Sequence, residues 1–271
     1  MHQIYPAPAP GSAGAAGVGA ASDGAGLLAG LYAYPGDQGG PWVRANMIAS
    51  VDGAAVIDGR SGALGGPADR MLLQVLRALA DVILVGAGTA RAERYRPARP
   101  VAALAALRQG RPVTPPIAVV SARLDLDPQA PLLAQAPAGA RTIVLTTAAA
   151  PADRRAAISR HAELIVAETE QLTADQVIGA LATLGHARVL AEGGPSLLAQ
   201  IAAEGLLDEL CLTVSPVLAG GSAGRILSGR NLGDQQLGTP EPLRLAHVLA
   251  DDGYLFCRYV REVGGIAWSA R

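Results

Sequence analysis

The stretch that decides the fold is Val82–Thr89, VILVGAGT. It begins with an unbroken apolar run closed by a glycine, which is typical of a strand buried on both faces of a parallel sheet. The Gly-Ala-Gly-Thr turn that follows lets the chain bend sharply and present backbone N–H groups at the start of a helix, a geometry that binds anions. An ordinary strand-to-helix turn explains the same residues equally well, so this turn alone does not establish a ligand.

Apolar runs like this one recur along the chain and alternate with segments of helical spacing. The predicted strands comprise residues 42–50, 82–86, 115–121, 142–147, 163–167, 187–194 and 209–218. The predicted helices comprise residues 65–80, 152–161, 173–184 and 195–204. Such alternation predicts an α/β fold with a mostly parallel sheet flanked by helices. Residues 243–260 instead form two strand-like runs joined by Asp-Asp-Gly, which predicts a C-terminal antiparallel hairpin.

Two regions of different composition divide the chain. Residues 1–40 are dominated by Pro, Gly, Ala and Ser, so we expect a flexible leader. Residues 41–265 carry the periodic apolar pattern, and we expect them to form one domain with a sizeable core. The leader lacks the pattern of a signal peptide, and no apolar run reaches the roughly 18 residues of a membrane span. We therefore expect a cytoplasmic protein that does not enter a membrane.

The composition argues against several classes of partner. The 22 basic and 23 acidic residues give a formal net charge of −1, which offers no attraction to nucleic acid or to an anionic membrane. Aromatic residues make up only 3% of the chain, too few to predict a surface on which bases stack. Cys211 and Cys257 are far apart, and the histidines show no ligand spacing, so we expect no metal site.

Polar residues follow several of the predicted strands, at the edge where α/β proteins bind their ligands. The segment EGGPS at residues 192–196 has two glycines that allow a pyrophosphate close to the backbone. The Glu192 carboxylate would repel a phosphate, so we expect it to point away or to pair with a cation. Ser121 and Arg123 follow another strand and suit the 2′-phosphate of NADP. A tight turn and a solvated loop end are the ordinary explanations of these motifs.

Two carboxylates are candidates for chemistry. Asp69 lies in the first turn of the predicted helix 65–80, where an acid that complements the helix dipole is also an ordinary feature. Asp52 follows the strand 42–50 in an Asp-Gly pair, which is common turn chemistry. The residues themselves leave both alternatives open.

Four segments taken together resemble a known family. They are NMIASVDG (46–53), ADRMLLQVLRALADVILVGAGT (68–89), LAEGGPSLLAQ (190–200) and LDELCLTVSPVLAGG (207–221). In this order they resemble the reductase domain of the bacterial riboflavin-pathway enzymes over about residues 41–260, and dihydrofolate reductase more distantly. The resemblance implies a dihydrofolate-reductase-like sheet, with NADPH as the cofactor.

The resemblance also implies roles for the candidate residues. It places Asp69 opposite the substrate as the catalytic group. The residues implied to hold the cofactor are Ser50, Gly86, Gly88, Thr89, Ser121, Arg123, Glu192, Gly193, Gly194, Pro195 and Ser196. The residues assigned to the substrate are Asn46, Asp52, Arg94 and Arg96, of which the two arginines are suggested by charge alone.

Two departures from the family pattern are visible. The zinc-deaminase motifs of the bifunctional members, His-x-Glu and Pro-Cys-x-x-Cys, do not occur, so we expect a stand-alone reductase. The usual Asp-Asp-Pro stretch after the first turn is replaced by AERYRP at residues 92–97, which weakens the assignment on the substrate side.

The resemblance predicts a function with two rivals. It implies that the chain reduces the ribosyl group of 5-amino-6-(5-phosphoribosylamino)uracil with NADPH. The expected binding partners are this small-molecule substrate and a second copy of the chain, which would form a homodimer. A dihydrofolate or pteridine reductase is the alternative enzyme, because the altered loop permits it. A non-catalytic NADP-binding protein is the alternative outside catalysis, although a binder needs no carboxylate such as Asp69 near the nicotinamide.

Overall fold

One ten-stranded sheet runs through the whole structure, with the strand order β1-β9-β10-β8-β2-β7-β3-β4-β5-β6. The computed structural model describes residues 1–6, 21–36, 39–228 and 240–262. The strands are β1 (His2–Tyr5), β2 (Trp42–Ser50), β3 (Val82–Gly86), β4 (Ile117–Val120), β5 (Ile143–Thr147), β6 (Glu163–Ala167), β7 (Arg188–Ala191), β8 (Glu209–Ser215), β9 (Leu243–Asp251) and β10 (Tyr254–Arg261).

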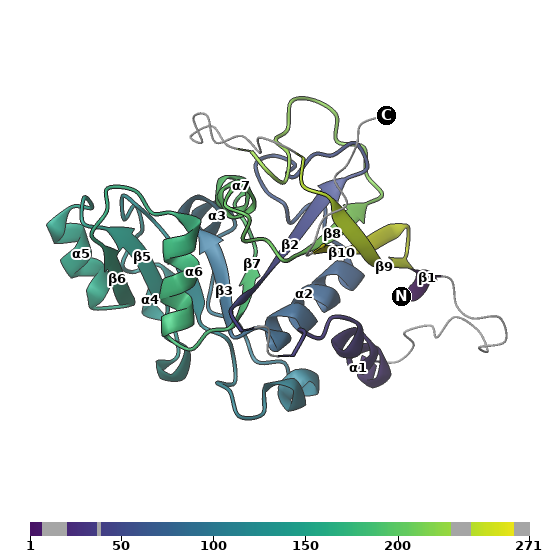
Figure 1. The fold of residues 1–271 in the computed structure, drawn as a ribbon, viewed down its shortest axis with the longest axis horizontal. Helices are drawn as coiled ribbons and strands as arrows, with labels where there is room; N and C mark the ends of the chain where they lie inside the picture. Colours follow the sequence, from purple (N-terminus) through teal and green to yellow (C-terminus); the bar gives the residue numbers. More distant parts are fainter. Residues whose placement is uncertain (7–20, 37–38, 229–239, 263–271) are drawn as a thin grey trace.

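Helices join the parallel strands and cover both faces of the sheet (Figure 1). They are α1 (Ala21–Leu31), α2 (Pro67–Leu79), α3 (Ala87–Ala92), α4 (Pro131–Ala134), α5 (Ala152–Ser159), α6 (Ala174–Thr183) and α7 (Pro195–Ala203), with the 3₁₀ helices η1 (Ala102–Arg108) and η2 (Ala138–Ala140). The strands from β8 to β6 pair in parallel, while β10 and β9 form an antiparallel hairpin beside β8. The predicted α/β class and C-terminal hairpin are confirmed.

The helix α2 positions most of the residues that concern function. It begins with Pro67 in its first turn, which fits because the N–H that proline lacks would have no partner there. Leu72, Val75 and Leu76 are buried, and they pack the helix against the sheet. The neighbouring face of α2 carries Asp69 and Arg77 and remains open to a cavity.

The N-terminal region differs from the expected flexible leader, and that prediction is wrong for the parts that the structure describes. Residues 2–5 form β1, which pairs with β9, and α1 packs beside α2 (Figure 1). The side chains of Leu28 and Tyr32 are completely buried, and Ala25 and Ala29 lie in the same core cluster. This spacing is that of an amphipathic helix, but it is built mainly from alanine and is therefore masked by the leader's composition. The end of the predicted domain, residues 263–265, lies outside the described residues.

The pairing of β1 with β9 also bears on the expected homodimer. The outer edge of the C-terminal hairpin, a surface on which a second copy could add a strand, is occupied by residues of the same chain. A dimer would have to use β1 or another surface.

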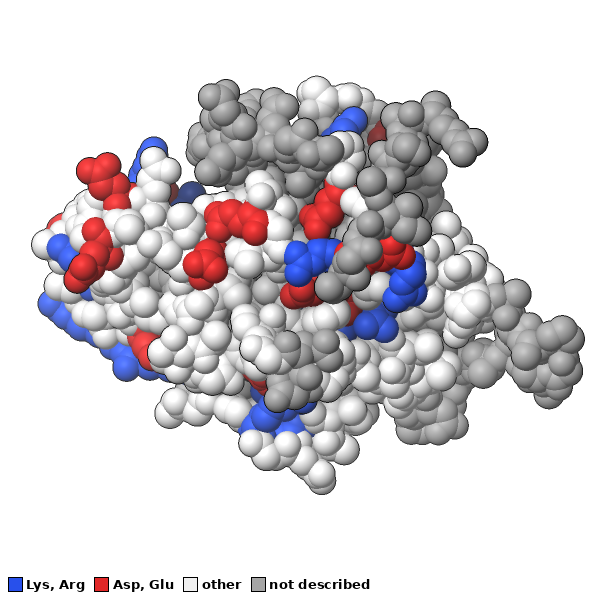
Figure 2. Space-filling view, viewed as in Figure 1, with Lys and Arg blue, Asp and Glu red and all other residues white. Residues whose placement is uncertain are grey.

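The charge distribution is mixed on the face shown in Figure 2. Acidic and basic side chains are interspersed there, and neither forms one large patch. Among the described residues, no helix is long and apolar enough to cross a membrane.

Candidate active site

The carboxyl ends of the parallel strands bring the predicted cofactor residues to one edge of the sheet. The strands β7, β3 and β4 are neighbours in that order, so the turns that follow them are adjacent. These turns contain Gly193, Gly86 and Ser121 respectively. The parallel register therefore unites three motifs that lie far apart in the sequence.

The turns after β3 and β7 touch each other through their glycines. The Gly86 amide donates a hydrogen bond to the Gly193 carbonyl at 2.9 Å. A Cβ atom at Gly194 would collide with the Thr89 hydroxyl, and Gly193 adopts a positive φ of 96° that favours glycine. The peptide bond between Gly193 and Gly194 is cis. The backbone conformation therefore favours glycine at position 193, and the close approach of Thr89 favours glycine at position 194.

This packing leaves a helix N-terminus available at the edge of the sheet. Gly194 is the N-cap of α7, no side chain caps it, and Pro195 follows in the first turn. The hydroxyl-bearing side chain of Ser196 is exposed beside it. Free backbone N–H groups at the positive end of a helix suit a pyrophosphate.

The turn after β4 supplies a free cation one strand further along this edge. Ser121 is buried, and its amide donates to the carbonyl of Leu145 at 2.9 Å. Arg123 is exposed, and its guanidinium has no hydrogen bond or ion pair with any residue that the structure describes. An unpaired guanidinium can take a phosphate in its planar fork without breaking another contact.

Sequence reasoning missed one hydroxyl on this edge. Thr147 ends β5, the strand next to β4, and its Oγ1 is buried without a partner among the described residues. A buried donor without a partner is uncommon and suggests a ligand or a water. The paired threonines at the end of the TIVLTT run were the available signal.

A cavity of about 280 Å³ lies between α2, β2 and the turn after β7. Asp69 and Arg77 line it from α2, Asn46 from β2, Tyr95 from the loop after α3, and Glu192 from the turn after β7. We call it the active-site cavity. These five residues come from four parts of the fold, and only Asp69, Asn46 and Glu192 were expected from the sequence.

A hydrogen bond to the sheet fixes the position of Asp69, which is half-buried in the wall of the active-site cavity. Its Oδ1 accepts a hydrogen bond from the Thr213 hydroxyl on β8 at 2.8 Å. Burial raises the pKa of Asp69, while the bond from Thr213 and the nearby charge of Arg70 act in the opposite direction. Although Asp69 lies in the first turn of α2, the helix shows no side-chain cap hydrogen bond. The carboxyl group therefore faces the cavity with one oxygen bonded to Thr213, and burial favours its protonated form more than in an exposed aspartate.

Asn46 contributes an acceptor to the same cavity. Its Oδ1 is buried and has no hydrogen-bond partner among the described residues. Together with Asp69 it presents oxygen acceptors to whatever occupies the cavity. A ligand with N–H donors would satisfy both.

Glu192 pairs with a cation, as the sequence predicted. Its carboxylate accepts two hydrogen bonds from Arg77, at 2.7 and 2.6 Å, and one from the Tyr95 hydroxyl at 2.7 Å. The side chain of Glu192 is only 4% exposed. This network turns the charge away from the glycine turn and closes one wall of the active-site cavity. We call Arg77, Tyr95 and Glu192 the wall network.

Two residues assigned to ligands by the sequence do not reach the active-site cavity. The Asp52 carboxylate accepts hydrogen bonds from the amides of Ala219 at 3.0 Å and Gly220 at 2.7 Å, and from the Ser50 hydroxyl. These bonds, that of Ser50 first, lower the pKa of Asp52 to about 2. Asp52 and Ser50 therefore order the loop after β2, and neither lines the cavity.

The two arginines assigned to the substrate lie behind the wall network. Arg94 and Arg96 line a separate cavity of about 450 Å³, with Tyr95 between it and the active-site cavity. The sequence indicated charge in this loop but could not show on which side of Tyr95 the arginines lie.

Comparison with known proteins agrees with this geometry. The profile of the RibD C-terminal domain family matches residues 41–254. A 2,5-diamino-6-ribosylamino-4(3H)-pyrimidinone 5′-phosphate reductase of Archaeoglobus fulgidus is 29% identical over 67% of this chain and 83% of its own. An enzyme of the same name from Methanothermobacter thermautotrophicus is 26% identical over 78% of this chain and 95% of its own.

Solved structures show the same fold. A pyrimidine reductase-like protein of Corynebacterium diphtheriae superposes with a TM-score of 0.75 at 29% identity, covering 82% of this chain and 92% of that one. RibD of Acinetobacter baumannii superposes with a TM-score of 0.64 at 23% identity, covering 83% of this chain and 59% of that one. Only part of the longer RibD chain therefore shares this fold.

Proposed function

The chain belongs to the RibD C-terminal domain family, and we propose that it is an NADPH-dependent reductase acting on a ribosylaminopyrimidine 5′-phosphate. The observation that carries the proposal is the union of two features at one sheet edge. The glycine turns after β3 and β7 form a phosphate-binding edge, and the half-buried Asp69 carboxyl lies in the adjacent cavity. A cofactor edge beside a protonatable group is what a hydride transfer with proton balance requires.

The residues present fit NADPH. The N-terminus of α7 and the turn after β3 suit the pyrophosphate, and the unpaired Arg123 beside Ser121 suits the 2′-phosphate. NADPH supplies a hydride when bound. The cofactor assignment rests on this fit and on the resemblance of the glycine motifs.

Side chains of the protein would orient the substrate and supply the proton during reduction. In the reaction the bond between ribose C1′ and the ring oxygen breaks, C1′ gains a hydride and the ring oxygen gains a proton. Asp69 is placed to hold that proton, because burial raises its pKa toward the working range of a general acid. Asn46 orients the substrate through its free Oδ1. The chain contains no lysine, so no lysine amine competes for these roles.

Two pyrimidines fit the proposal and differ at one position. The resemblance implies the uracil compound, with an oxygen at C2, whereas the two archaeal relatives are named for the 2-amino compound. The buried Oδ1 of Asn46 offers an acceptor, which pairs with an amino group and repels a carbonyl oxygen. We therefore propose that the 2,5-diaminopyrimidinone form is the preferred substrate. We also propose that the protein acts in the cytoplasm.

The test is an absorbance assay of NADPH oxidation with each pyrimidine and with dihydrofolate. We expect turnover with the ribosylaminopyrimidines, faster with the diamino form. Turnover of dihydrofolate alone would support the pteridine alternative. NADPH binding without turnover of any compound would support a cofactor-binding protein.

A further inference from the structure

Four polar side chains are buried on one face of β8. Successive residues of a strand point to opposite faces of the sheet, so Glu209, Cys211, Thr213 and Ser215 share one face. This face lies under α2, since Cys211 belongs to the same core cluster as Leu72. Each of the four is at most 1% exposed. A buried polar group is costly without a partner, so the partners of this row show what the strand holds in place.

Two hydroxyls of this row fasten the start of α2 and the loop before it. Thr213 donates a hydrogen bond to the Oδ1 of Asp69 at 2.8 Å, and Ser215 donates one to the Leu64 carbonyl at 2.8 Å. The Ser215 bond ends on the backbone, whereas the Thr213 bond ends on a group that can gain and lose a proton. Support of the fold and control of Asp69 therefore belong to different residues of the same strand.

The Asp69 carboxyl is confined from two sides. Thr213 contacts Oδ1, and a Cβ atom at Gly65 would lie only 2.8 Å from Oδ2, so the Gly65 backbone lies close against that oxygen. Gly65 and Asp69 both line the active-site cavity. Thr213 is the one hydrogen-bond partner of the Asp69 side chain within the part of the chain that the structure describes. The two oxygens are therefore inequivalent: Oδ1 is bonded to the sheet, and Oδ2 is left for the cavity.

The buried hydroxyl of Thr213 decides which of these oxygens takes a proton. A threonine hydroxyl has one hydrogen to donate, and Oδ1 of Asp69 is its acceptor. A proton on Oδ1 would point at that hydrogen, and Thr213 would have to turn its own hydrogen into an interior where it is 1% exposed. A buried donor without an acceptor is costly. A proton on Oδ2 leaves the bond from Thr213 in place.

We propose that Thr213 is a positioning residue, which keeps Oδ1 of Asp69 as an acceptor so that the carboxyl carries its proton on Oδ2, beside the cavity. The proposal rests on the function inferred above only for the fate of that proton. In that reaction the O–H bond at Oδ2 breaks, and the ribose ring oxygen takes the proton together with the electron pair of its breaking bond to C1′. The electron pair of the O–H bond stays on the carboxylate, whose negative charge the Thr213 hydroxyl stabilises.

The other groups packed around this carboxyl act on it only from a distance. Burial raises the pKa of Asp69, while the Thr213 bond and the charge of Arg70, the next residue of α2, lower it. On β8, Glu209 is paired with two arginines of the neighbouring strands. On β10, the Tyr254 ring lies against the backbone just before α2.

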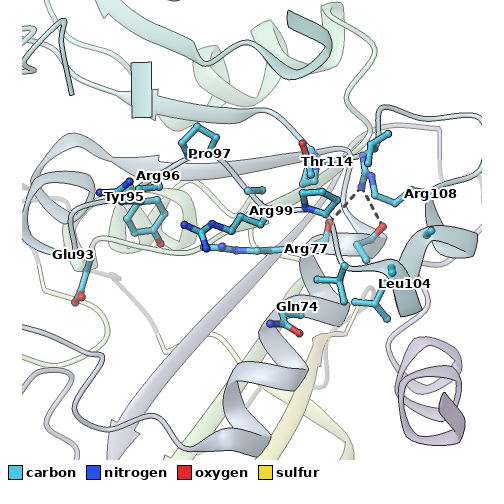
Figure 3. A pocket seen from close by; sticks show the side chains of 18 of the residues that line it. Gln74, Arg77, Glu93, Tyr95, Arg96, Pro97, Arg99, Leu104, Arg108 and Thr114 are labelled. Atoms are coloured by element: carbon cyan, nitrogen blue, oxygen red, sulfur yellow. Dashed lines mark hydrogen bonds between the residues drawn. The ribbon is translucent and has the colours of Figure 1, made fainter. Parts of the chain in front are cut away.

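The charged groups across the cavity are engaged by other partners. Arg77 donates two hydrogen bonds to Glu192, and Glu93 accepts one from the Ser61 amide at 2.7 Å. Figure 3 shows the Arg77 side chain extended from α2 toward Tyr95, with Glu93 apart from it. Removal of the Thr213 hydroxyl therefore changes the one direct bond to the Asp69 carboxyl among the described residues and leaves these pairs intact.

An NMR titration of the ligand-free protein, with ¹³C in the aspartate carboxyls, tests the proposal. The Asp69 signal is the one absent from Asp69→Asn. In Thr213→Val the pKa of Asp69 should rise by about one to two units, because the ionised form loses a hydrogen bond. Thr213→Ser should restore the wild-type value. Ser215→Ala is the matched control: it removes a buried hydroxyl from the same face of β8, and it should lower stability without moving this pKa.

The direction of the change separates the two possible arrangements. A pKa that falls in Thr213→Val would mean that Thr213 accepts a proton held on Oδ1, and it would overturn the proposal, as would an unchanged pKa. Thr213→Ala also lacks the hydroxyl and replaces Thr213→Val if the valine variant does not fold. Neutron diffraction from deuterated crystals below the pKa of Asp69 should place the deuteron on Oδ2; a deuteron on Oδ1 would overturn the proposal.

Turnover provides a separate arm. The pH at which NADPH oxidation declines should move upward in Thr213→Val together with the NMR titration, and the KM for NADPH should stay unchanged. A decline that stays in place while the pKa of Asp69 moves would overturn the assignment of this proton to the ring oxygen. Neither the titration nor the diffraction requires turnover, so absence of reductase activity would contradict the proposed function and leave the role of Thr213 standing.

Discussion

The amide of Gly86 donates a hydrogen bond to the carbonyl of Gly193, and this 2.9 Å contact joins the turn after β3 to the turn after β7. These residues are 107 positions apart in the sequence, but β3 and β7 are neighbours in the sheet. The contact fixes the two turns as one surface. The proposed phosphate-binding edge depends on it.

Gly194→Ala should strongly weaken NADPH binding. The added Cβ would collide with the Thr89 hydroxyl and force the two turns apart. Fluorescence titration measures the dissociation constant, and Gly194→Ala should cost less affinity in a Thr89→Ala background than in the wild type, because the colliding oxygen is gone. Gly179→Ala in α6 is the matched control, since a Cβ there meets no atom within 4 Å. If Gly194→Ala costs as much in the Thr89→Ala background as in the wild type, the collision is not the cause.

Arg123→Ala should separate the two nicotinamide cofactors. Loss of one charge-assisted phosphate contact costs on the order of 1.5–3 kcal/mol, so NADPH binding should weaken roughly 10- to 100-fold. NADH, which lacks the 2′-phosphate, should bind as before. Arg160→Ala provides the control for loss of an exposed arginine. Equal losses for NADPH and NADH would show that Arg123 supports the fold and not the phosphate.

Asp69→Asn should reduce turnover far more than cofactor binding. Asparagine retains the size of the side chain and an oxygen acceptor for Thr213, but it cannot transfer a proton. General acid–base loss is worth roughly 10²–10⁴ in rate. Asp153→Asn is the matched control, because Asp153 is also an acid in the first turn of a helix, α5. Near-normal turnover in Asp69→Asn would show that Asp69 only complements the dipole of helix α2 and has no catalytic role.

The pH dependence of stability gives an independent check on Asp69. Burial raises its folded-state pKa above the ordinary value of 3.8, so folding favours the protonated form. The contribution of this group to stability is then fully present below pH 3.8 and is lost as the pH rises through the raised pKa. Asp69→Asn does not titrate, so the difference in unfolding free energy between wild type and variant should change across that interval. A constant difference from pH 3.5 to pH 8 would contradict the raised pKa.

The sequence predicted the parallel sheet and the edge at which its glycine and serine turns meet, because both depend on local pattern. A buried strand such as Val82–Gly86 is an unbroken apolar run, and its closing glycine marks the turn at the sheet edge. The parallel order then brings Gly86, Gly193 and Ser121 together without further information. Short motifs at strand ends were therefore sufficient.

The substrate side depends on contacts that no local pattern contains. Arg77 looked like one more polar position on α2, and its pairing with Glu192 spans 115 residues. Tyr95 gave no signal of its own, because its role comes from where the loop after α3 crosses α2. Asp52 appeared to be free, but the backbone amides of residues 219–220 occupy its oxygens. Long-range pairing of this kind becomes visible only in the folded chain.

The N-terminal region provides the last prediction, which reverses the expectation from composition. Leu28→Ala should destabilise the protein by about 2–5 kcal/mol, because Leu28 is fully buried among residues of α2 and β10 and its truncation leaves a cavity. Leu27→Ala is the matched control: Leu27 is 40% exposed, so the same truncation should cost much less, within roughly 0.5–1 kcal/mol. Deletion of residues 1–35 should lower the free energy of unfolding further, since it removes the Arg258 contact to the Leu31 carbonyl and uncovers the side of α2 that faces α1. Urea unfolding of the three variants measures these differences. If Leu28→Ala and Leu27→Ala are equally stable, α1 does not pack on the rest of the protein in solution, and the original prediction of a flexible leader holds.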